Sequence, residues 1–146
     1  MSTFDLRLET RKEELKTLFT SLYGSDEKLG SLILSMREYY DRRSDELKSL
    51  DKEREDNPLW YRKGDMLGLT MYSDLFASSL KGLKGKVGYL KKLSLKYLHL
   101  MPLMKMPKKD NDGGYAVEDF YSVDPRFGTN EDLIALTKEL RKHGIS

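Results

Sequence analysis

The residues best suited to chemistry form a short glycine-centred segment in the second half of the chain, Asp112–Tyr115 (Asp-Gly-Gly-Tyr). An acid and an aromatic ring flank two glycines, which let the backbone adopt positive φ and approach a ligand closely. The apolar stretch Tyr97–Met101 precedes this segment and is typical of a strand, which ends at Pro102 because proline cannot donate to a central ladder. Many α/β folds carry site residues on loops that follow such strands. We therefore expect the acid and the aromatic ring at the carboxyl end of this strand.

The same residues have simpler interpretations. Asp112 can be an Asx-turn residue and Tyr115 a core aromatic, and the residue types alone favour these roles. Asp110–Asp112 also resembles part of a calcium loop. An EF-hand that began at Asp110 would need glycine at position 115 and glutamate at position 121, and both positions hold tyrosine. We therefore expect no metal site in this segment.

Other polar residues stand out by position, and each has a structural explanation. His99 lies in the middle of the predicted strand, so we expect a hydrogen-bonded core histidine rather than a catalyst. Asp124 precedes Pro125 and is expected to form a turn. A group of lysines favours the solvated outer face of a helix over a phosphate or nucleic-acid site. These are Lys81, Lys84, Lys91 and Lys92.

The composition argues against several classes of protein. The 146 residues have the length of one ordinary domain, and a formal net charge of +2 indicates neither a nucleic-acid nor a membrane partner. The chain contains no cysteine, which excludes disulfides and thiolate chemistry and favours a cytoplasmic location. Residues 1–7 carry charges where a signal peptide has an apolar run, and no window is apolar enough to span a membrane. We expect a soluble intracellular protein.

Residues 66–101 have the pattern of one β-α-β unit. Met66–Tyr72 is apolar on both faces, which favours a strand that helices cover on each side. Two serines then precede a stretch from Leu80 to Leu93 with apolar residues at helical spacing. Tyr97–Met101 forms the second strand. Such a unit implies parallel strands and a right-handed crossover.

The remaining residues continue the α/β pattern without completing a sheet. Residues 102–128 are expected to form a long loop, which in a compact domain usually carries a site. Thr129–Asp132 has the pattern of a capping box and begins a last helix, which Gly144 ends. No third strand follows. Since a closed barrel takes about 250 residues, we expect the incomplete start of a larger sheet.

Residues 1–64 are expected to form a helical domain with a connector. The first helix should span residues 4–23, and Gly24 is placed to end it. Ser25–Glu27 offers an N-cap for a second helix, which should run to Asn57-Pro58. The predicted inward face of the first helix consists of Leu8, Leu15, Leu18, Phe19 and Leu22.

The second predicted helix leaves two alternatives open. Its apolar residues between Leu29 and Leu50 alternate spacings of four and three, with Arg43 as the one interruption. Such a helix packs most often on its own domain, but the pattern also fits a short coiled-coil seam. A non-catalytic helical interaction module is therefore a competing hypothesis for the function of this chain.

Several segments resemble, in order and spacing, the α-amylase superfamily (glycoside hydrolase family thirteen). They are Tyr97–Pro102, Asp112–Val117, Val123–Pro125, Phe127–Thr129 and Glu131–Leu133. Some segments resemble the amylosucrases of that superfamily more than its other members, and these are Leu22–Gly24, Arg54–Pro58, Asp74–Ala77, Leu80–Leu83 and Leu98–Pro102. The resemblance implies an α/β fold in which a helical domain, 1–64, precedes the first β-α-β-α part of a TIM (β/α)8 barrel, 65–146.

The resemblance implies a retaining enzyme that needs no cofactor. It would move the glucosyl unit of sucrose to an α-1,4-glucan and release fructose. A sucrose hydrolase or another enzyme of the α-amylase family is the alternative. Retaining enzymes use two carboxylates about 5 Å apart. In the family these carboxylates lie beyond the position of Ser146, so the resemblance implies no catalytic residue in this chain and no activity by the chain alone.

The resemblance also implies roles for individual residues. Tyr115 resembles the aromatic residue that stacks on the glucosyl ring. Asp112 resembles the acid that closes the floor of the same pocket in a salt bridge with an arginine from a later segment. The chain departs from the family in two places where the family tends to have glycine: it has Ser78-Ser79 in one, and Ser94, before the second strand, in the other.

Overall fold

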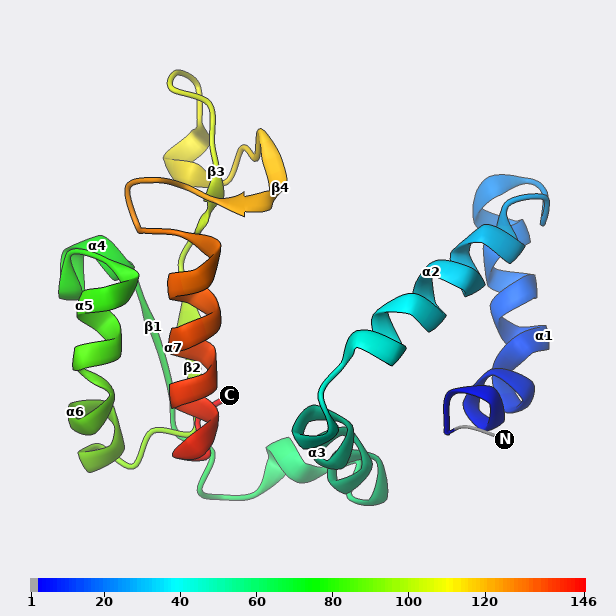
Figure 1. The fold of residues 1–146 in the computed structure, drawn as a ribbon, viewed down its shortest axis with the longest axis horizontal. Helices are drawn as coiled ribbons and strands as arrows, with labels where there is room; N and C mark the ends of the chain where they lie inside the picture. Colours follow the sequence, from blue (N-terminus) through cyan, green and yellow to red (C-terminus); the bar gives the residue numbers. More distant parts are fainter. Residues whose placement is uncertain (1–2) are drawn as a thin grey trace. The chain divides into compact units, whose positions relative to one another are not determined.

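The computed structural model describes residues 3–146, which fall into two compact units. The first unit extends to Trp60 and the second runs from Tyr61 to Ser146. Figure 1 labels the elements of both units, and each unit is described below by itself. Within residues 3–146, no helix is long and apolar enough to cross a membrane.

The helical unit begins as the sequence predicts. Helix α1 spans Thr3–Tyr23. Gly24 ends it with φ of 78°, and its amide donates to the Thr20 carbonyl at 2.8 Å. Glycine suits this position because a left-handed conformation costs it little. The predicted first helix and its cap are thus confirmed.

The second predicted helix is wrong in its start and in its continuity. Helix α2, Leu29–Arg42, begins without a side-chain cap, so Ser25–Glu27 does not form the expected N-cap. A separate helix α3, Asp45–Asp56, follows. Ser44 breaks the run because its backbone is extended and its hydroxyl accepts from the Leu47 amide at 3.3 Å, as an N-cap does. The apolar run from Leu29 to Leu50 is therefore not one continuous coiled-coil seam.

Polar contacts dominate the helical unit. Among its described residues only Phe4 and Leu29 are buried hydrophobic side chains, while Leu18 and Leu22 of the predicted inward face are 63% and 75% exposed. Arg37 lies over the Phe4 ring, 4.7 Å from its centroid. Ion pairs connect the helices instead of a core: Arg7–Glu55 at 2.6 Å, Arg37–Asp5 at 2.5 Å and, across the break, Arg43–Asp51 at 2.6 Å.

The second unit contains the predicted β-α-β arrangement. Strands β1, Gly68–Met71, and β2, Tyr97–Leu100, are parallel, with Gly68 beside Tyr97 and Met71 beside Leu100. The connection is three short helices rather than one: α4, Ser73–Ala77; α5, Leu80–Gly85; and α6, Val87–Lys92. Ser79 caps α5, because its hydroxyl accepts from the Gly82 amide at 3.1 Å.

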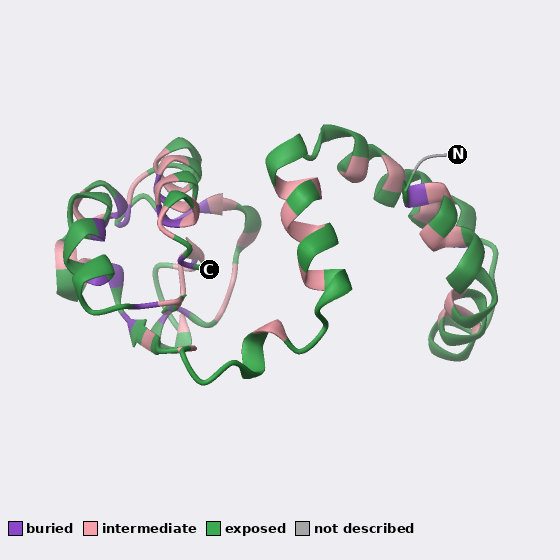
Figure 2. Ribbon diagram, turned by 90° about the horizontal axis from the view of Figure 1, so that it is seen from below, coloured by how far each residue is buried: buried purple, intermediate pink, exposed green. Residues whose placement is uncertain are grey.

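One face of the β1–β2 pair carries the core. Helix α7, Asn130–Lys142, starts with the predicted capping box of Thr129 and Asp132, and Gly144 follows it with φ of 67°. The buried cluster includes side chains from α5, α6, β2 and α7 (Figure 2, purple). Its most buried members are Leu80, Leu83, Leu90, Leu136 and Ile145.

The other face of the β1–β2 pair is exposed. Burial alternates along both strands, so Leu69, Met71, Leu98 and Leu100 are at least half-buried while Gly68, Thr70, Tyr97 and His99 are exposed. The prediction that residues 66–72 are covered on both faces is wrong for this structure. The prediction of a core histidine is also wrong, because the pleat turns His99 to the exposed face.

The far edge of β2 is paired at one residue. The Leu98 amide donates to the Ser146 carbonyl at 2.8 Å, and the Ser146 amide donates to the Lys96 carbonyl at 2.9 Å. This is the hydrogen-bond pattern of a parallel ladder. Ser146 therefore occupies the position where a third parallel strand would start.

Residues 102–128 are not the structureless loop that the sequence predicts. They contain an antiparallel pair, β3, Met104–Lys105, and β4, Asp119–Val123, and a 3₁₀ turn, Asp112–Gly114. A two-residue strand close to two prolines gives no recognisable alternation, which is why the pattern missed it.

The buried carboxylate of Asp124 holds this segment together. It accepts from the Met106 amide at 3.3 Å, the Arg126 amide at 3.0 Å and the Arg126 Nε at 3.2 Å. The bond to the amide two residues ahead confirms the predicted turn. Burial opposes ionisation, but the hydrogen bonds from Arg126 and Met106 and the charge of Arg126 outweigh it, so the pKa of Asp124 is lowered.

We predict that Gly82→Ala destabilises the second unit. An added Cβ would lie 1.9 Å from the Ala77 carbonyl oxygen, and overpacking of this kind costs about 1–3 kcal/mol. Gly88→Ala is the matched control, since no atom lies within 4 Å of its added Cβ and alanine gains up to about 1 kcal/mol in a helix. Urea denaturation measures both; equal midpoints would contradict the close approach of α4 and α5.

Ser78→Gly and Ser94→Gly are expected to stabilise the chain. Both serines have positive φ, 64° and 57°, which costs an L-residue about 1–2 kcal/mol. Glycine avoids this cost at an entropic penalty of about 0.5–1 kcal/mol. Ser79→Gly is the control, because Ser79 has φ of −166° and caps α5, so the same change should lower the melting temperature there. A lower melting temperature for all three variants would contradict the expectation.

Asp124→Asn should lower the free energy of unfolding near neutral pH by about 1.5–3 kcal/mol, the usual contribution of hydrogen bonds to a charged group. Because the folded pKa is lowered, the carboxylate stabilises the fold above its unfolded pKa, and this is lost as pH falls through the folded pKa. The variant should therefore lose less stability than the parent on acidification. Asp65→Asn, at an exposed connector residue, is the control; identical acid profiles for parent and D124N would refute the assignment.

Candidate functional site

The Asp-Gly-Gly-Tyr segment forms a tight turn near the end of β2. Three consecutive residues have positive φ: Asp112 at 47°, Gly113 at 66° and Gly114 at 98°. A Cβ on Gly114 would lie 3.2 Å from both the Met106 Cε and the Pro102 Cβ. The glycine pair therefore does what the sequence predicts, since it permits the left-handed backbone and brings the turn against the segment that leaves β2.

Tyr115 lies where the sequence predicts, at the carboxyl end of β2. Its hydroxyl donates to the Met101 sulfur at 3.7 Å, a weak contact that nonetheless places the ring beside the residue after the strand. The side chain is 57% exposed. The alternative of a core aromatic is thus wrong, and the ring has a free surface.

Asp112 is exposed at the start of the same turn. Its carbonyl accepts from the Tyr115 amide at 3.2 Å, so the acid and the aromatic residue are connected by one short backbone bond. Among residues 3–146, no side-chain hydrogen bond or ion pair of the Asp112 carboxylate is found. The carboxylate is therefore available to accept from hydroxyl or guanidinium donors.

A cavity of about 500 Å³ adjoins the turn. Asn111, the residue before Asp112, lines it and donates from its side-chain amide to the Pro107 carbonyl at 3.3 Å. The Asn111 carbonyl accepts from the amides of Gly114 and Ala116 at 2.8 and 3.0 Å. The lining mixes cations, carboxylates and apolar surface: Lys105, Met106, Pro107, Lys108, Glu118, Asp124, Pro125 and Arg126.

Charge in this cavity is largely paired within the protein. Lys105 contacts Glu118 at 3.1 Å, and Arg126 contacts Asp124 at 3.2 Å. Residues 3–146 bring together no group of three or more His, Cys, Asp or Glu side chains that could hold a metal ion. The arrangement suits hydrogen bonding to a polar ligand. Sequence reasoning missed Met101, Met106 and Asn111, because two methionines look like ordinary core residues and the asparagine like an ordinary turn residue.

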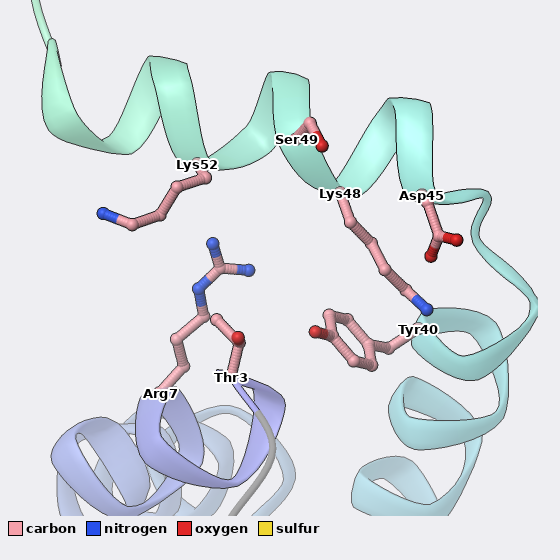
Figure 3. Close-up of a pocket in the computed structure, with 7 residues that line it drawn as sticks. All are labelled: Thr3, Arg7, Tyr40, Asp45, Lys48, Ser49 and Lys52. Carbon is pink, nitrogen blue, oxygen red and sulfur yellow. The ribbon is translucent and has the colours of Figure 1, made fainter.

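The helical unit has a separate cavity of about 500 Å³ between its helices (Figure 3). Three cationic side chains, Arg7, Lys48 and Lys52, are among the residues that line it. Arg7 bonds Glu55, Lys52 bonds Asp56, and the Lys48 ammonium lies 4.8 Å from the Tyr40 ring centroid. Carboxylates compensate the charges of Arg7 and Lys52, and the Tyr40 ring lies against the Lys48 ammonium, so the cavity has a structural explanation.

The lysines of the crossover helices are exposed, as expected for a solvated face. All four of those singled out in the sequence are exposed, and Lys81 lies 3.9 Å from Asp132. They do not surround a cavity that involves the turn. The candidate site is therefore the turn at the carboxyl end of β2, with Asp112 and Tyr115 as its exposed functional groups.

Comparison with known proteins finds similar sequences among curated enzymes with several different names. Trehalose synthase/amylase TreS of Mycobacterium tuberculosis is 32% identical over 94 residues, which are 61% of this chain and 15% of that protein. Oligo-1,6-glucosidase of Heyndrickxia coagulans is 38% identical over 66 residues, 45% of this chain and 12% of that protein. Alpha-glucosidase of Schizosaccharomyces pombe is 36% identical over 95 residues, 60% of this chain and 16% of that protein. The chain thus spans about a sixth or less of these relatives.

Solved structures also match this chain. A family GH13_31 enzyme matches with a TM-score of 0.51 and 28% identity, over 59% of this chain and 17% of that one. Trehalose-6-phosphate hydrolase of Bacillus licheniformis matches with a TM-score of 0.51 and 28% identity, over 60% and 16%. The family profile of the α-amylase catalytic domain matches residues 37–146, and so includes α3 of the helical unit. Because this match covers most of the chain, the protein belongs to the α-amylase family, within its catalytic domain.

Proposed function

We propose that this chain forms part of the glucosyl-binding site of a retaining, amylosucrase-like enzyme. The enzyme would move the glucosyl unit of sucrose to an α-1,4-glucan and release fructose, in the cytoplasm and without a cofactor. The observation that carries the proposal is the position of Tyr115 beside Met101, at the carboxyl end of a parallel strand. Active sites of (β/α)8 enzymes lie at that end of their strands.

Tyr115 would hold the sugar by stacking. The C–H groups of a glucosyl ring form an apolar face, and an aromatic ring covers it at little entropic cost because tyrosine has few rotatable bonds. The 57% exposure of Tyr115 leaves its surface accessible, and the Met101 sulfur restrains its hydroxyl end. The ring would thus fix the sugar before the reaction.

Asp112 would bound the pocket on one side. A carboxylate accepts hydrogen bonds from sugar hydroxyls and pairs with an arginine in bidentate geometry. In the proposed enzyme an arginine outside residues 1–146 would supply that partner. Asp112 is exposed and lies one turn from Tyr115, so both groups could contact one terminal sugar.

The residues described here would bind substrate and leave bond cleavage to other residues. Retaining enzymes need a nucleophilic carboxylate and an acid about 5 Å apart on either side of the scissile bond. We assign neither role within residues 1–146, and the chain alone should not turn over sucrose.

A second candidate is another activity of the same family. The curated relatives are named trehalose synthase/amylase, oligo-1,6-glucosidase and trehalose-6-phosphate hydrolase, which favours related glucosides as alternative substrates. Hydrolysis of sucrose is a further alternative. The helical interaction module has less support, since Ser44 divides the apolar run on which it depended.

The test is turnover by a polypeptide that continues this chain through the remaining barrel strands. With sucrose and a glucan acceptor, we expect fructose release and glucan growth. Free glucose as the main product would indicate a hydrolase, and turnover of trehalose or isomaltose but not sucrose would refute the substrate assignment.

In that enzyme, Tyr115→Ala should lower kcat/KM by roughly tenfold or more, because a loss of about 1.4 kcal/mol in transition-state binding is tenfold in rate. Tyr115→Phe keeps the ring and should have a much smaller effect. Tyr121→Ala is the control, since Tyr121 is 83% exposed on β4. Equal losses for Y115A and Y121A would remove the assigned role of Tyr115.

A further inference from the structure

The exposed turn contains the one aspartate in the chain that precedes a glycine, Asp112-Gly113, and no asparagine precedes a glycine. The amide nitrogen after an aspartate can attack the side-chain carboxyl, and a following side chain normally shields that nitrogen. Glycine has no side chain and gives no such shielding. We propose that Asp112-Gly113 is a site of spontaneous isoaspartate formation, so that the exposed acid of the candidate site can itself be modified.

The chemistry needs no co-reactant besides water. The Gly113 nitrogen loses its proton and attacks the Asp112 Cγ, a new N–Cγ bond forms, and the carboxyl oxygen leaves as water. The product is a five-membered succinimide. Water then adds to one of its two carbonyls; opening at the Asp112 backbone carbonyl leaves the chain connected through Cγ. Since one water leaves and one returns, the mass of the protein is unchanged.

The surroundings of Gly113 allow the attack. Asp112 and Gly113 are both exposed, and no atom lies within 4 Å of the position that a Gly113 Cβ would occupy. Asp112 has φ of 47°, a conformation that an L-residue adopts at a cost, so the turn gains when the residue leaves it. The turn is held by short-range backbone bonds, from Gly114 to Asn111 and from Tyr115 to Asp112. Local opening therefore breaks few contacts.

Other aspartates in the same segment are protected. Asp110 is also exposed with positive φ, but the side chain of Asn111 follows it and is itself anchored to Pro107. The carboxylate of Asp119 is engaged by the Ser122 hydroxyl and the Tyr121 amide, and that of Asp124 is buried. Asp110 thus serves as an internal reference, because it is exposed like Asp112 but is not followed by glycine.

Isomerisation would change the site itself. The main chain would gain one methylene, the former backbone carboxyl would become the free carboxylate, and the bond from the Tyr115 amide to the Asp112 carbonyl would be lost. Both exposed groups of the turn would move. A loss of sugar binding as a result rests on the proposed function; the modification itself does not.

The experiment uses the full chain, incubated at neutral pH and body temperature and then digested. Isoaspartate is measured by enzymatic methylation with isoaspartyl methyltransferase and located by mass spectrometry with electron-transfer fragmentation. We expect isoaspartate to accumulate at position 112 and not at position 110. Asp112→Glu should abolish the signal, because glutamate would have to close a six-membered ring, and Gly113→Ala should reduce it.

Two results would overturn the proposal. One is the absence of isoaspartate at position 112, or a level no higher than at position 110. The other is formation in the folded chain at a rate far below that in the same chain held in urea, since the native turn would then protect the bond. Either result leaves the proposed glucosyl-binding role untouched, which the sucrose assay tests separately.

Discussion

The parallel pairing of β1 and β2 is the constraint on which the second unit depends. Two parallel strands need a connection that returns across one face, and helices α4 to α6 make that return, with leucines of α5 and α6 in the core that Met71 and Leu98 of the strands also join. Parallel pairing also brings the carboxyl ends of both strands to one edge. The segment between β2 and α7 therefore starts at this edge, at Met101, and its Tyr115 lies beside Met101 at the same edge.

Polar side chains and apolar burial together shape the segment between β2 and α7, which contributes Met106, Val123 and Phe127 to the core. Asp124 binds the Met106 and Arg126 amides, and Asn111 binds the Pro107 carbonyl. Asn130 connects β4 to the start of α7, because it donates to the Tyr121 carbonyl and accepts from the Val123 amide, each at 2.9 Å. Such bonds hold the short β3–β4 sheet in place, since unpaired amides would be costly. They leave Asp112, Gly113 and Tyr115 of the turn exposed.

The two units are stabilised by different means. The second unit buries a contiguous apolar cluster, whereas the helical unit has few buried side chains and relies on ion pairs such as Arg7–Glu55. Exposed ion pairs contribute little each. Most of the stability should therefore reside in the unit that carries the candidate site.

The sequence by itself determined what depends on neighbours along the chain: the capping box at Thr129, the left-handed glycines of the turn, the parallel β-α-β unit and the family. Tertiary structure decided the rest. Residue patterns assigned His99 to the core, although only one face of β2 is covered. They predicted one long helix, whereas the Ser44 hydroxyl caps a second helix. They predicted no structure for residues 102–128, which contain the β3–β4 pair and the hydrogen bonds of Asp124. The exposure of His99 and the Met106–Asp124 bond depend on residues distant in the sequence, and the helix break depends on whether the Ser44 hydroxyl or a helix carbonyl accepts a backbone hydrogen bond. Residue spacing carries no information on these contacts.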